Sequence, residues 1–453
     1  MRSKQAMALA LAAGAALATA GPAWAVTQTG AAATAHARAV ATTRAGAARH
    51  WHNRIPDSAF APGSGQLVAD WNKTLIGILG VPGAEPASVH PTRSFAILQA
   101  AEYDAVVSVT HAGRPYAVEV RVHGRASAAA AADQAAHNVL TSLFPAQSSI
   151  ADAQLATELA AIPDGAAKGK GIAAGSEVAA RLLALRAGDG ATRTPPPFVP
   201  GTAPGDYQLT PPKFAPPVFT NWGGITPFVL RSGSQFRPDA PPPVTTTAYT
   251  RALAEVESLG QDTSTTRTAE QTAIGKFWGA GPIWVVWNEI AQDQVTAHHS
   301  SLARATSVFA TLDLALADTA IGLYDAKYHF QVWRPVTAIR AGVQGSFTAN
   351  PAWTPLAATA PDPSYPGAHS GFSFAAATVL TEFFGQSPVT VREDALAGHT
   401  RSFDGFFAAA VEAALSRIYA GQHTPLDDHA GRVLGFRVAT FAVAFLDPFG
   451  ARG

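Results

Sequence analysis

Three short segments in the C-terminal half of the sequence carry residue types that could do chemistry together. The first, "KYHFQVWRP", sets Lys327 and Arg334 among aromatic residues. Their spacing of seven residues predicts that both cations project from one face of a helix, which Pro335 then ends. Two like charges in an aromatic setting indicate an anion held away from water. The alternative is a solvated basic edge.

The second segment, "SYPGAHSGFS", places His369 just before an apolar run. Pro366, Gly367 and Ala368 predict a tight turn of small residues, with Ser370 as the N-cap of the helix that follows. A histidine at a helix N-terminus lies where free N–H groups and the helix dipole favour anions. The alternative is a helix-starting turn whose histidine has no function.

The third segment, "SRIYAGQHTPLDDHAG", combines an arginine, a histidine and a carboxylate. Arg417 lies in the last turns of a predicted helix, and His423 comes just beyond its end. Thr424 and Pro425 predict the start of the next helix. Asp427, four residues after His423, could orient the imidazole ring. A surface loop between two helices is the alternative.

Taken in order, these motifs resemble those of the vanadium-dependent haloperoxidase and type-2 phosphatidic acid phosphatase superfamily. The residues that match its first and third motifs are Lys327, Arg334, Pro335, Ser416, Arg417, His423 and Asp427. Stretches such as "WNKTLIGIL", "PTRSFAILQAAEYDAV" and "NWGGITPFVL" are similar to the bacterial vanadium haloperoxidase-like branch, over roughly residues 66 to 448. The chain is therefore identified as a member of this superfamily.

The resemblance implies a pocket for vanadate, in which phosphate can take the same place. Lys327, Arg334 and Arg417 would neutralise the oxyanion, because guanidinium groups suit bidentate contacts and lysine adds a point charge. Gly367 and Ala368 would add backbone N–H donors.

The two histidines receive separate roles from the resemblance. His423 would be the axial vanadium ligand, or the nucleophile that accepts a phosphoryl group. Asp427 would hold its other ring nitrogen. His369 would be the acid–base group.

The implied activity is that of a vanadate-dependent haloperoxidase. Vanadium would act as a Lewis acid, hydrogen peroxide would oxidise a halide, and the hypohalous acid would halogenate a small organic acceptor. A soluble acid phosphatase, acting on a phosphate monoester through a phospho-histidine, is the first alternative. The second is a degraded, oxyanion-binding member without activity. A zinc-type hydrolase using His369, His423, His429 and Asp427 is the third, and it would set three cationic side chains beside a metal ion.

Two positions depart from the family pattern. Gly367 stands where the family has serine, which removes a hydroxyl donor whose bond to a charged group is worth roughly 1.5–3 kcal/mol. Ser364, Ser370 or water could compensate. Asp362 lies where an aromatic residue or histidine often flanks the halide region, and an ionised carboxylate there would repel halide.

The elements that position these residues are predicted to be helices. Long Ala/Leu-rich stretches recur at helical period and strand-type alternation is scarce, so we expect an all-α fold of two helical bundles. The expected divisions are a signal peptide (1–25), a flexible lead-in (26–60), an N-terminal helical half (61–193), a Pro-rich crossover (194–245) and a C-terminal catalytic bundle (246–453).

Composition and the N-terminus set the expected location and partners. "MRSK", an apolar run and Ala23-Trp24-Ala25 have the order of a cleaved secretory signal, so we expect a secreted or periplasmic protein without a membrane span. The chain has no cysteine, and 32 basic residues balance 32 acidic ones at a pI near 7.3. These values exclude disulfides and give no electrostatic reason to expect nucleic acid. The oligomeric state is left open.

Overall fold

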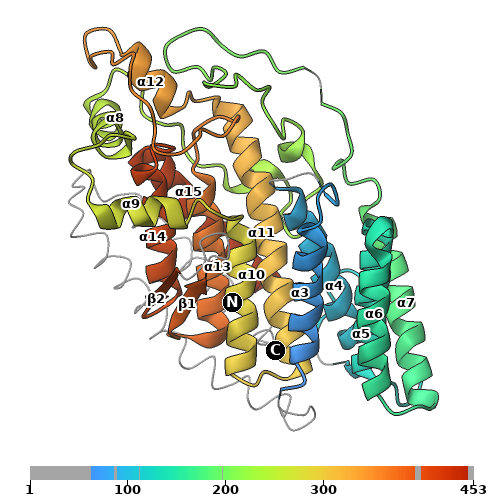
Figure 1. The fold of residues 1–453 in the computed structure, drawn as a ribbon. Helices are drawn as coiled ribbons and strands as arrows, with labels where there is room; N and C mark the ends of the chain where they lie inside the picture. The colour runs from blue at the N-terminus through green and yellow to red at the C-terminus, as the bar shows by residue number, and fades with distance from the viewer. Residues whose placement is uncertain (1–62, 86–88, 112, 196, 393–398, 447–453) are drawn as a thin grey trace, which may run out of the picture.

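The computed structural model describes residues 63–85, 89–111, 113–195, 197–392 and 399–446. The expected signal peptide and lead-in lie outside this part. Within it the chain forms thirteen α-helices and one two-stranded antiparallel sheet (Figure 1). The predicted all-α fold class is therefore confirmed.

The N-terminal helices lie together on one side of the molecule (Figure 1). They are α3 (Gln66–Leu79), α4 (His90–Thr110), α5 (Ala128–Leu143), α6 (Ser148–Ala161) and α7 (Ala166–Arg186). Pro91 occupies the first turn of α4, where its missing N–H costs nothing, and the Ser127 side chain caps α5.

The remaining helices follow the crossover. They are α8 (Thr247–Gly260), α9 (Ala269–Phe277), α10 (Ile283–Ala297), α11 (Leu302–Phe330), α12 (Pro335–Ala341), α13 (Ala368–Phe384), α14 (Phe406–Tyr419) and α15 (Pro425–Leu446). The strands β1 (Val389–Arg392) and β2 (Thr400–Phe403) form a hairpin between α13 and α14.

Helix α11 is the central element of the fold. It packs against α3 and α4 on one side and against α13 and α15 on the other, within one continuous hydrophobic core (Figure 1). Both α11 and α15 are long and apolar enough to cross a membrane by length and composition. In α11, however, 94% of the apolar window is buried inside the protein, as in the core helix of a soluble protein.

The Pro-rich crossover is fixed to α11 by polar contacts. The carboxylate of Asp318 accepts backbone N–H bonds from Phe228, Val229 and Leu230, each at 2.7 Å. Trp222 is buried in the crossover, whereas Phe214 is 58% exposed. The crossover thus packs on the bundle, although not every aromatic side chain takes part.

Two local predictions are wrong. Lys327 and Arg334 do not share a helix face, because Gln331 adopts a left-handed conformation (φ 49°) and ends α11. Arg334 is instead the N-cap of α12, with Pro335 as its first residue. Ser370 is not an N-cap either: α13 begins at Ala368, after Gly367.

Three carboxyl side chains lie buried on α4, α5 and α11: Glu102, Asp133 and Asp313. Trp71 donates to Asp133 at 2.9 Å and Asn288 donates to Asp313 at 3.0 Å, while both oxygens of Glu102 lack a partner among the described residues. Burial raises the pKa of Asp133 to about 7 and of Asp313 to about 8. Burial, with repulsion from the other two carboxyls, raises the pKa of Glu102 well above its usual value.

These raised pKa values predict that the protein loses stability as the pH rises. A carboxyl whose folded-state pKa exceeds its unfolded value of about 4 makes the free energy of unfolding fall from that pH up to the folded-state pKa. For Asp313 this window extends to about pH 8.

Replacing Asp313 by Asn should therefore stabilise the protein mainly at high pH. The amide oxygen can still accept the Asn288 bond, but no charge has to be buried. We expect the Tm to rise by about 2 °C or more at pH 8.5 and by less at pH 5, measured by circular dichroism. Asp325→Asn, which breaks the Arg237 ion pair, is the control and should lower the Tm at both pH values. An equal rise for Asp313→Asn at both values would contradict the prediction.

Candidate oxyanion site

Ends of several helices meet at one place in the C-terminal bundle. Helices α13 and α15 approach closely there, since a Cβ atom on Gly431 or Gly435 would overlap the carbonyl oxygens of Gly367 and Gly371. This glycine contact sets the first turn of α13 against the second and third turns of α15. The C-terminal end of α11 and the start of α12 complete the surroundings through their contacts with residues 362–364 and 422–423.

Arg334 is the most extensively bonded cation of the site. It is 2% exposed, and its Nε donates to the backbone oxygen of Asp362 at 2.7 Å. Its Nη2 donates to the Asp362 carboxylate in a close ion pair. Its Nη1 donates to the Gln422 carbonyl at 3.1 Å and lies 3.2 Å from His423 Nε2. The Arg334 guanidinium therefore donates to four acceptor atoms of the protein itself.

Lys327 is fully buried in the last turn of α11, beside the same carboxylate. Its ammonium donates to the carbonyl oxygens of Pro363 and Ser364 and lies 3.5 Å from Asp362 Oδ2. Burial lowers the pKa of Lys327 to about 8, partly offset by the Asp362 charge. Burial alone would raise the pKa of Asp362, but Lys327 and Arg334 outweigh it and hold that pKa at about 2.

Arg417, near the end of α14, is the cation that lacks partners. Its Nε and Nη1 atoms are buried and make no hydrogen bond to any described residue. Burial, together with the Arg334 charge, lowers the pKa of Arg417 to about 10, so the group stays charged at neutral pH. A buried cation with unused donors is costly unless an anion binds it. The Nε and Nη1 atoms of Arg417 are therefore donors that an anion could use.

His423 presents a neutral imidazole to this cluster. Burial, then the charges of Arg334 and Lys327, lower its pKa well below the usual range. Since Arg334 donates toward Nε2, that nitrogen holds a lone pair and Nδ1 carries the hydrogen. Nδ1 lies 3.4 Å from Ser364 Oγ and 3.5 Å from Asp427 Oδ2.

Asp427 has closer partners than the imidazole it was expected to orient. Its Oδ2 accepts from the Thr424 N–H at 2.7 Å and from the Ser364 hydroxyl at 2.8 Å. The Asp427 N–H lies 3.3 Å from Thr424 Oγ1, which makes the reciprocal contact of a helix-capping pair. Asp427 therefore caps α15 and fixes Ser364, and its contact with His423 is longer than a normal hydrogen bond.

His369 is the second residue of α13 and contacts a different partner. Its Nε2 lies 3.0 Å from the Trp278 carbonyl oxygen, which can only accept, so Nε2 carries the hydrogen and Nδ1 is the basic nitrogen. Burial, followed by the Arg417 charge, lowers the pKa of His369 well below its usual value. The imidazole is thus a neutral base.

One of the two expected backbone donors is already used. The Gly367 N–H donates to the Asp427 carbonyl at 2.8 Å, so in this arrangement it does not face an oxyanion. Ala368 is the first residue of α13, where a backbone N–H has no intrahelical acceptor, and it fits the expected role. The hydroxyls of Ser364 and Ser370 donate to Asp427 and Asp428, so neither replaces the family serine.

The cluster also contains two backbone carbonyls and a hydroxyl whose contacts the sequence did not predict. The carbonyl oxygens of Trp278 and Gln422 bind His369 and Arg334, and the Ser364 hydroxyl links Asp427 to the region of His423. Backbone carbonyls leave no signature in side-chain motifs. Asp362 is visible in the sequence as a departure, but its pairing with Arg334 required the loop to be placed.

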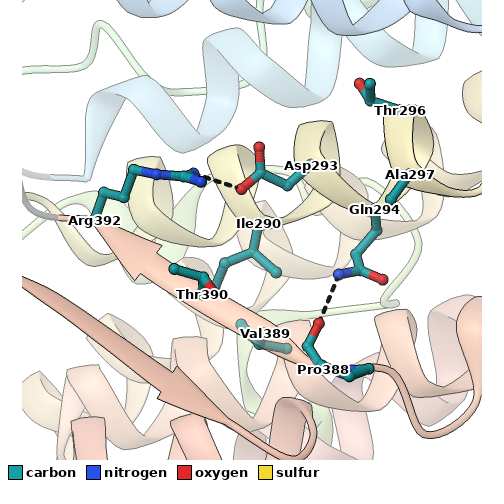
Figure 2. Close-up of a pocket in the computed structure, with 9 residues that line it drawn as sticks. All are labelled: Ile290, Asp293, Gln294, Thr296, Ala297, Pro388, Val389, Thr390 and Arg392. Atoms are coloured by element: carbon teal, nitrogen blue, oxygen red, sulfur yellow. Dashed lines mark hydrogen bonds and ion pairs between the residues drawn. The ribbon is translucent and has the colours of Figure 1, made fainter.

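A surface hollow elsewhere is separate from this cluster. It measures about 310 Å³ and lies between α10 and β1, where Arg392 pairs with Asp293 and Gln294 donates to the Pro388 carbonyl (Figure 2). Strand β1 follows the C-terminal end of α13, and the cation cluster lies at the N-terminal end of that 17-residue helix, about 25 Å away.

The cluster fits a tetrahedral oxyanion such as vanadate or phosphate in charge and donor type. Arg417 offers unpartnered donors and Ala368 offers a helix N-terminal amide. The lone pair of His423 Nε2 faces Arg334 Nη1 in this structure and would have to leave that contact to bind a ligand. The oxyanion would share the positive charges of Arg334 and Lys327 with the Asp362 carboxylate. Among the described residues, no group of three or more His, Asp or Glu side chains is arranged to hold a metal ion, so the zinc alternative gains no support.

Comparisons with known proteins agree with this geometry. The family model of the VCPO second helical-bundle domain matches residues 307–449, which contain the whole cluster. No curated protein sequence matches the chain.

A solved structure described as the first bacterial vanadium-dependent iodoperoxidase is 25% identical, with a TM-score of 0.75 over 85% of this chain and 97% of that chain. A holo-type bacterial vanadium-dependent chloroperoxidase is 16% identical, with a TM-score of 0.63 over 84% and 97% of the two chains. The apo-type structure of a bacterial vanadium-dependent chloroperoxidase is 17% identical, with a TM-score of 0.60 over 82% and 96%. The matched domain and the shared architecture support a vanadium haloperoxidase-like family for this chain.

Proposed function

We propose that this chain is a vanadate-dependent haloperoxidase that uses hydrogen peroxide to oxidise a halide. The observation that carries the proposal is the buried guanidinium of Arg417, whose unpartnered Nε and Nη1 share a cluster with Lys327, Arg334 and His423. Such a cluster suits an oxyanion, and the family supplies vanadate as its identity.

Each residue of the cluster would make a different contribution to binding the oxyanion. Arg417 would hold the oxyanion by two N–H donors, Lys327 would add charge, and the Ala368 amide would add a donor at a helix N-terminus. His423 Nε2, released from its contact with Arg334 Nη1, would coordinate the vanadium through its lone pair. When bound, vanadate supplies a Lewis-acidic centre that activates hydrogen peroxide.

His369 has the properties of a base in this reaction. Its neutral imidazole can accept a proton from hydrogen peroxide at Nδ1, while the Trp278 carbonyl holds Nε2–H and fixes the ring. Oxidation of iodide then follows H₂O₂ + I⁻ + H⁺ → HOI + H₂O, in which the imidazolium returns the proton it took from the peroxide and the proton on the left comes from solvent. The hypohalous acid would halogenate a small organic acceptor.

A soluble acid phosphatase is the second candidate, since the same pocket can hold the phosphoryl group of a phosphate monoester. His423 Nε2 would then be the nucleophile and His369 the acid that protonates the leaving alcohol. The lowered pKa of His369 argues against this role, because a general acid must begin the reaction protonated. A chain that binds the oxyanion without catalysis remains the third candidate.

We also propose that the protein is exported. The N-terminal basic stretch, the apolar run and Ala23-Trp24-Ala25 motivate this proposal. Sequencing of the N-terminus after expression in a bacterial secretion host tests it, and a retained residue 1 would contradict it.

The first experiment separates the candidate activities. The protein, with and without added orthovanadate, is assayed for iodide and bromide oxidation by peroxide and for p-nitrophenyl phosphate hydrolysis. We expect vanadate-dependent oxidation of iodide, the most easily oxidised of the halides, and its loss by at least 100-fold in His423→Ala because the axial ligand is removed. His429→Ala is the matched control and should keep the activity. Hydrolysis inhibited by vanadate, without halide oxidation, would support the phosphatase instead.

A pair of substitutions at position 367 measures how much a serine hydroxyl there would contribute to vanadate binding. A Cβ on Gly367 would lie 3.1 Å from the Asp427 carbonyl oxygen, so Gly367→Ala and Gly367→Ser share the same crowding. We expect Gly367→Ser to bind vanadate about tenfold or more tightly than Gly367→Ala, because the serine adds a charge-assisted hydrogen bond. Calorimetric titration measures both constants, and equal affinities would show that the hydroxyl does not reach the oxyanion.

The affinity for an oxyanion should also depend on pH through Lys327. The pKa of this buried ammonium is about 8, so the pocket loses one positive charge as the pH rises through that value. We expect the Kd for tungstate, a stable dianion over this range, to increase between pH 7 and pH 9 in the wild type. In Lys327→Met the Kd should be higher and nearly constant, and the same pH dependence in both proteins would contradict the assignment.

A further inference from the structure

The carboxylate of Asp362 pairs with two of the three cations of the cluster. It is 4% exposed, pairs with Arg334 Nη2 and lies 3.5 Å from Lys327 Nζ. Its backbone oxygen takes the Arg334 Nε–H at 2.7 Å. Asp362 therefore accepts two hydrogen bonds from the Arg334 guanidinium and neutralises part of the Lys327 charge.

Few N–H donors of Arg334 remain available to a ligand. Nη1 is directed to the Gln422 carbonyl and to His423 Nε2, so four of the five N–H groups have acceptors within the protein. Arg417, by contrast, keeps two buried nitrogens unpartnered. The cluster thus contains one cation open to a ligand and two that are paired internally.

We propose that Asp362 is an internal counter-anion that competes with the bound oxyanion for Arg334 and Lys327, and thereby sets how tightly and with what charge preference the site binds. The inference rests on the proposed oxyanion pocket. An incoming dianion has to share two cations with a fixed negative charge a few ångströms away. The repulsion grows in proportion to the ligand charge, so it penalises dianions more than monoanions.

Asp362→Asn tests the inference with little change of shape. The amide oxygen can still accept the Arg334 bond, and the backbone contact to Nε is untouched. We expect the Kd for tungstate, a tetrahedral dianion, to fall at least tenfold relative to wild type. The Kd for perchlorate, a tetrahedral monoanion, should fall by about the square root of that factor, because its charge is half as large. Calorimetric titration at pH 7 measures all four constants.

Thermal unfolding gives a second readout. Removing one partner of a buried ion pair leaves an uncompensated charge, so the Tm of Asp362→Asn without anion should fall. Tungstate at saturating concentration should then raise the Tm of the variant more than that of the wild type. If the variant folds only when tungstate is present during refolding, the inference is also supported.

Asp428→Asn is the matched control. Asp428 is buried near the same helix ends, but it pairs with Ser370 and Arg432 and makes no contact with Lys327 or Arg334 in the structure. Its substitution should leave the ratio of tungstate to perchlorate affinity unchanged.

The possible outcomes are distinguishable. Unchanged or weaker tungstate binding in folded Asp362→Asn overturns the inference and leaves the oxyanion pocket standing. An equal gain for tungstate and perchlorate, or the same gain in Asp428→Asn, shows that charge competition at position 362 is not the cause. If neither wild type nor Asp362→Asn binds any probe, the proposed oxyanion site itself fails, and the inference fails with it.

Discussion

The burial of three positive side chains within one helical core is the constraint on which the site depends. Moving a charged group out of water costs several kcal/mol unless acceptors replace its hydration. Lys327 meets this cost with two backbone carbonyls and the Asp362 carboxylate, and Arg334 meets it with four acceptors. Arg417 lacks such partners at Nε and Nη1, and this difference is the basis for proposing an anion there.

The residues of the cluster are held together because several helices begin or end at the same place. Lys327 lies in the last turn of α11, where exposed carbonyls favour a cation, whereas Ala368 and His369 begin α13, where free amides favour an anion. The close glycine contact between α13 and α15 holds these ends together, because any side chain at Gly431 or Gly435 would separate them. The hydrophobic core around α11 thus holds in place the helix ends that carry the residues of the cluster.

The sequence predicts the helical class and singles out residues that the fold brings together, because periodicity and motif spacing are local properties. It does not predict how the chain turns between them. Lys327 and Arg334 look like neighbours on one helix face, yet they meet only because Gln331 ends α11 and Arg334 starts α12. Asp427 looks like a partner of His423, but its nearest bonds are to Thr424 and Ser364. The carbonyls of Trp278 and Gln422 were not predicted, since any residue type could supply them.

The two departures from the family pattern lie within six residues of each other and act in the same direction. Gly367 removes a hydroxyl donor, and Asp362 adds a negative charge; both weaken the hold on an oxyanion. The same carboxylate, however, neutralises Arg334 and Lys327 when no ligand is present. A core with three unpaired cations would be far less stable than one with a single open guanidinium. Asp362 therefore lets the chain fold around its own cations before it meets an anion, and weaker binding follows from that stability.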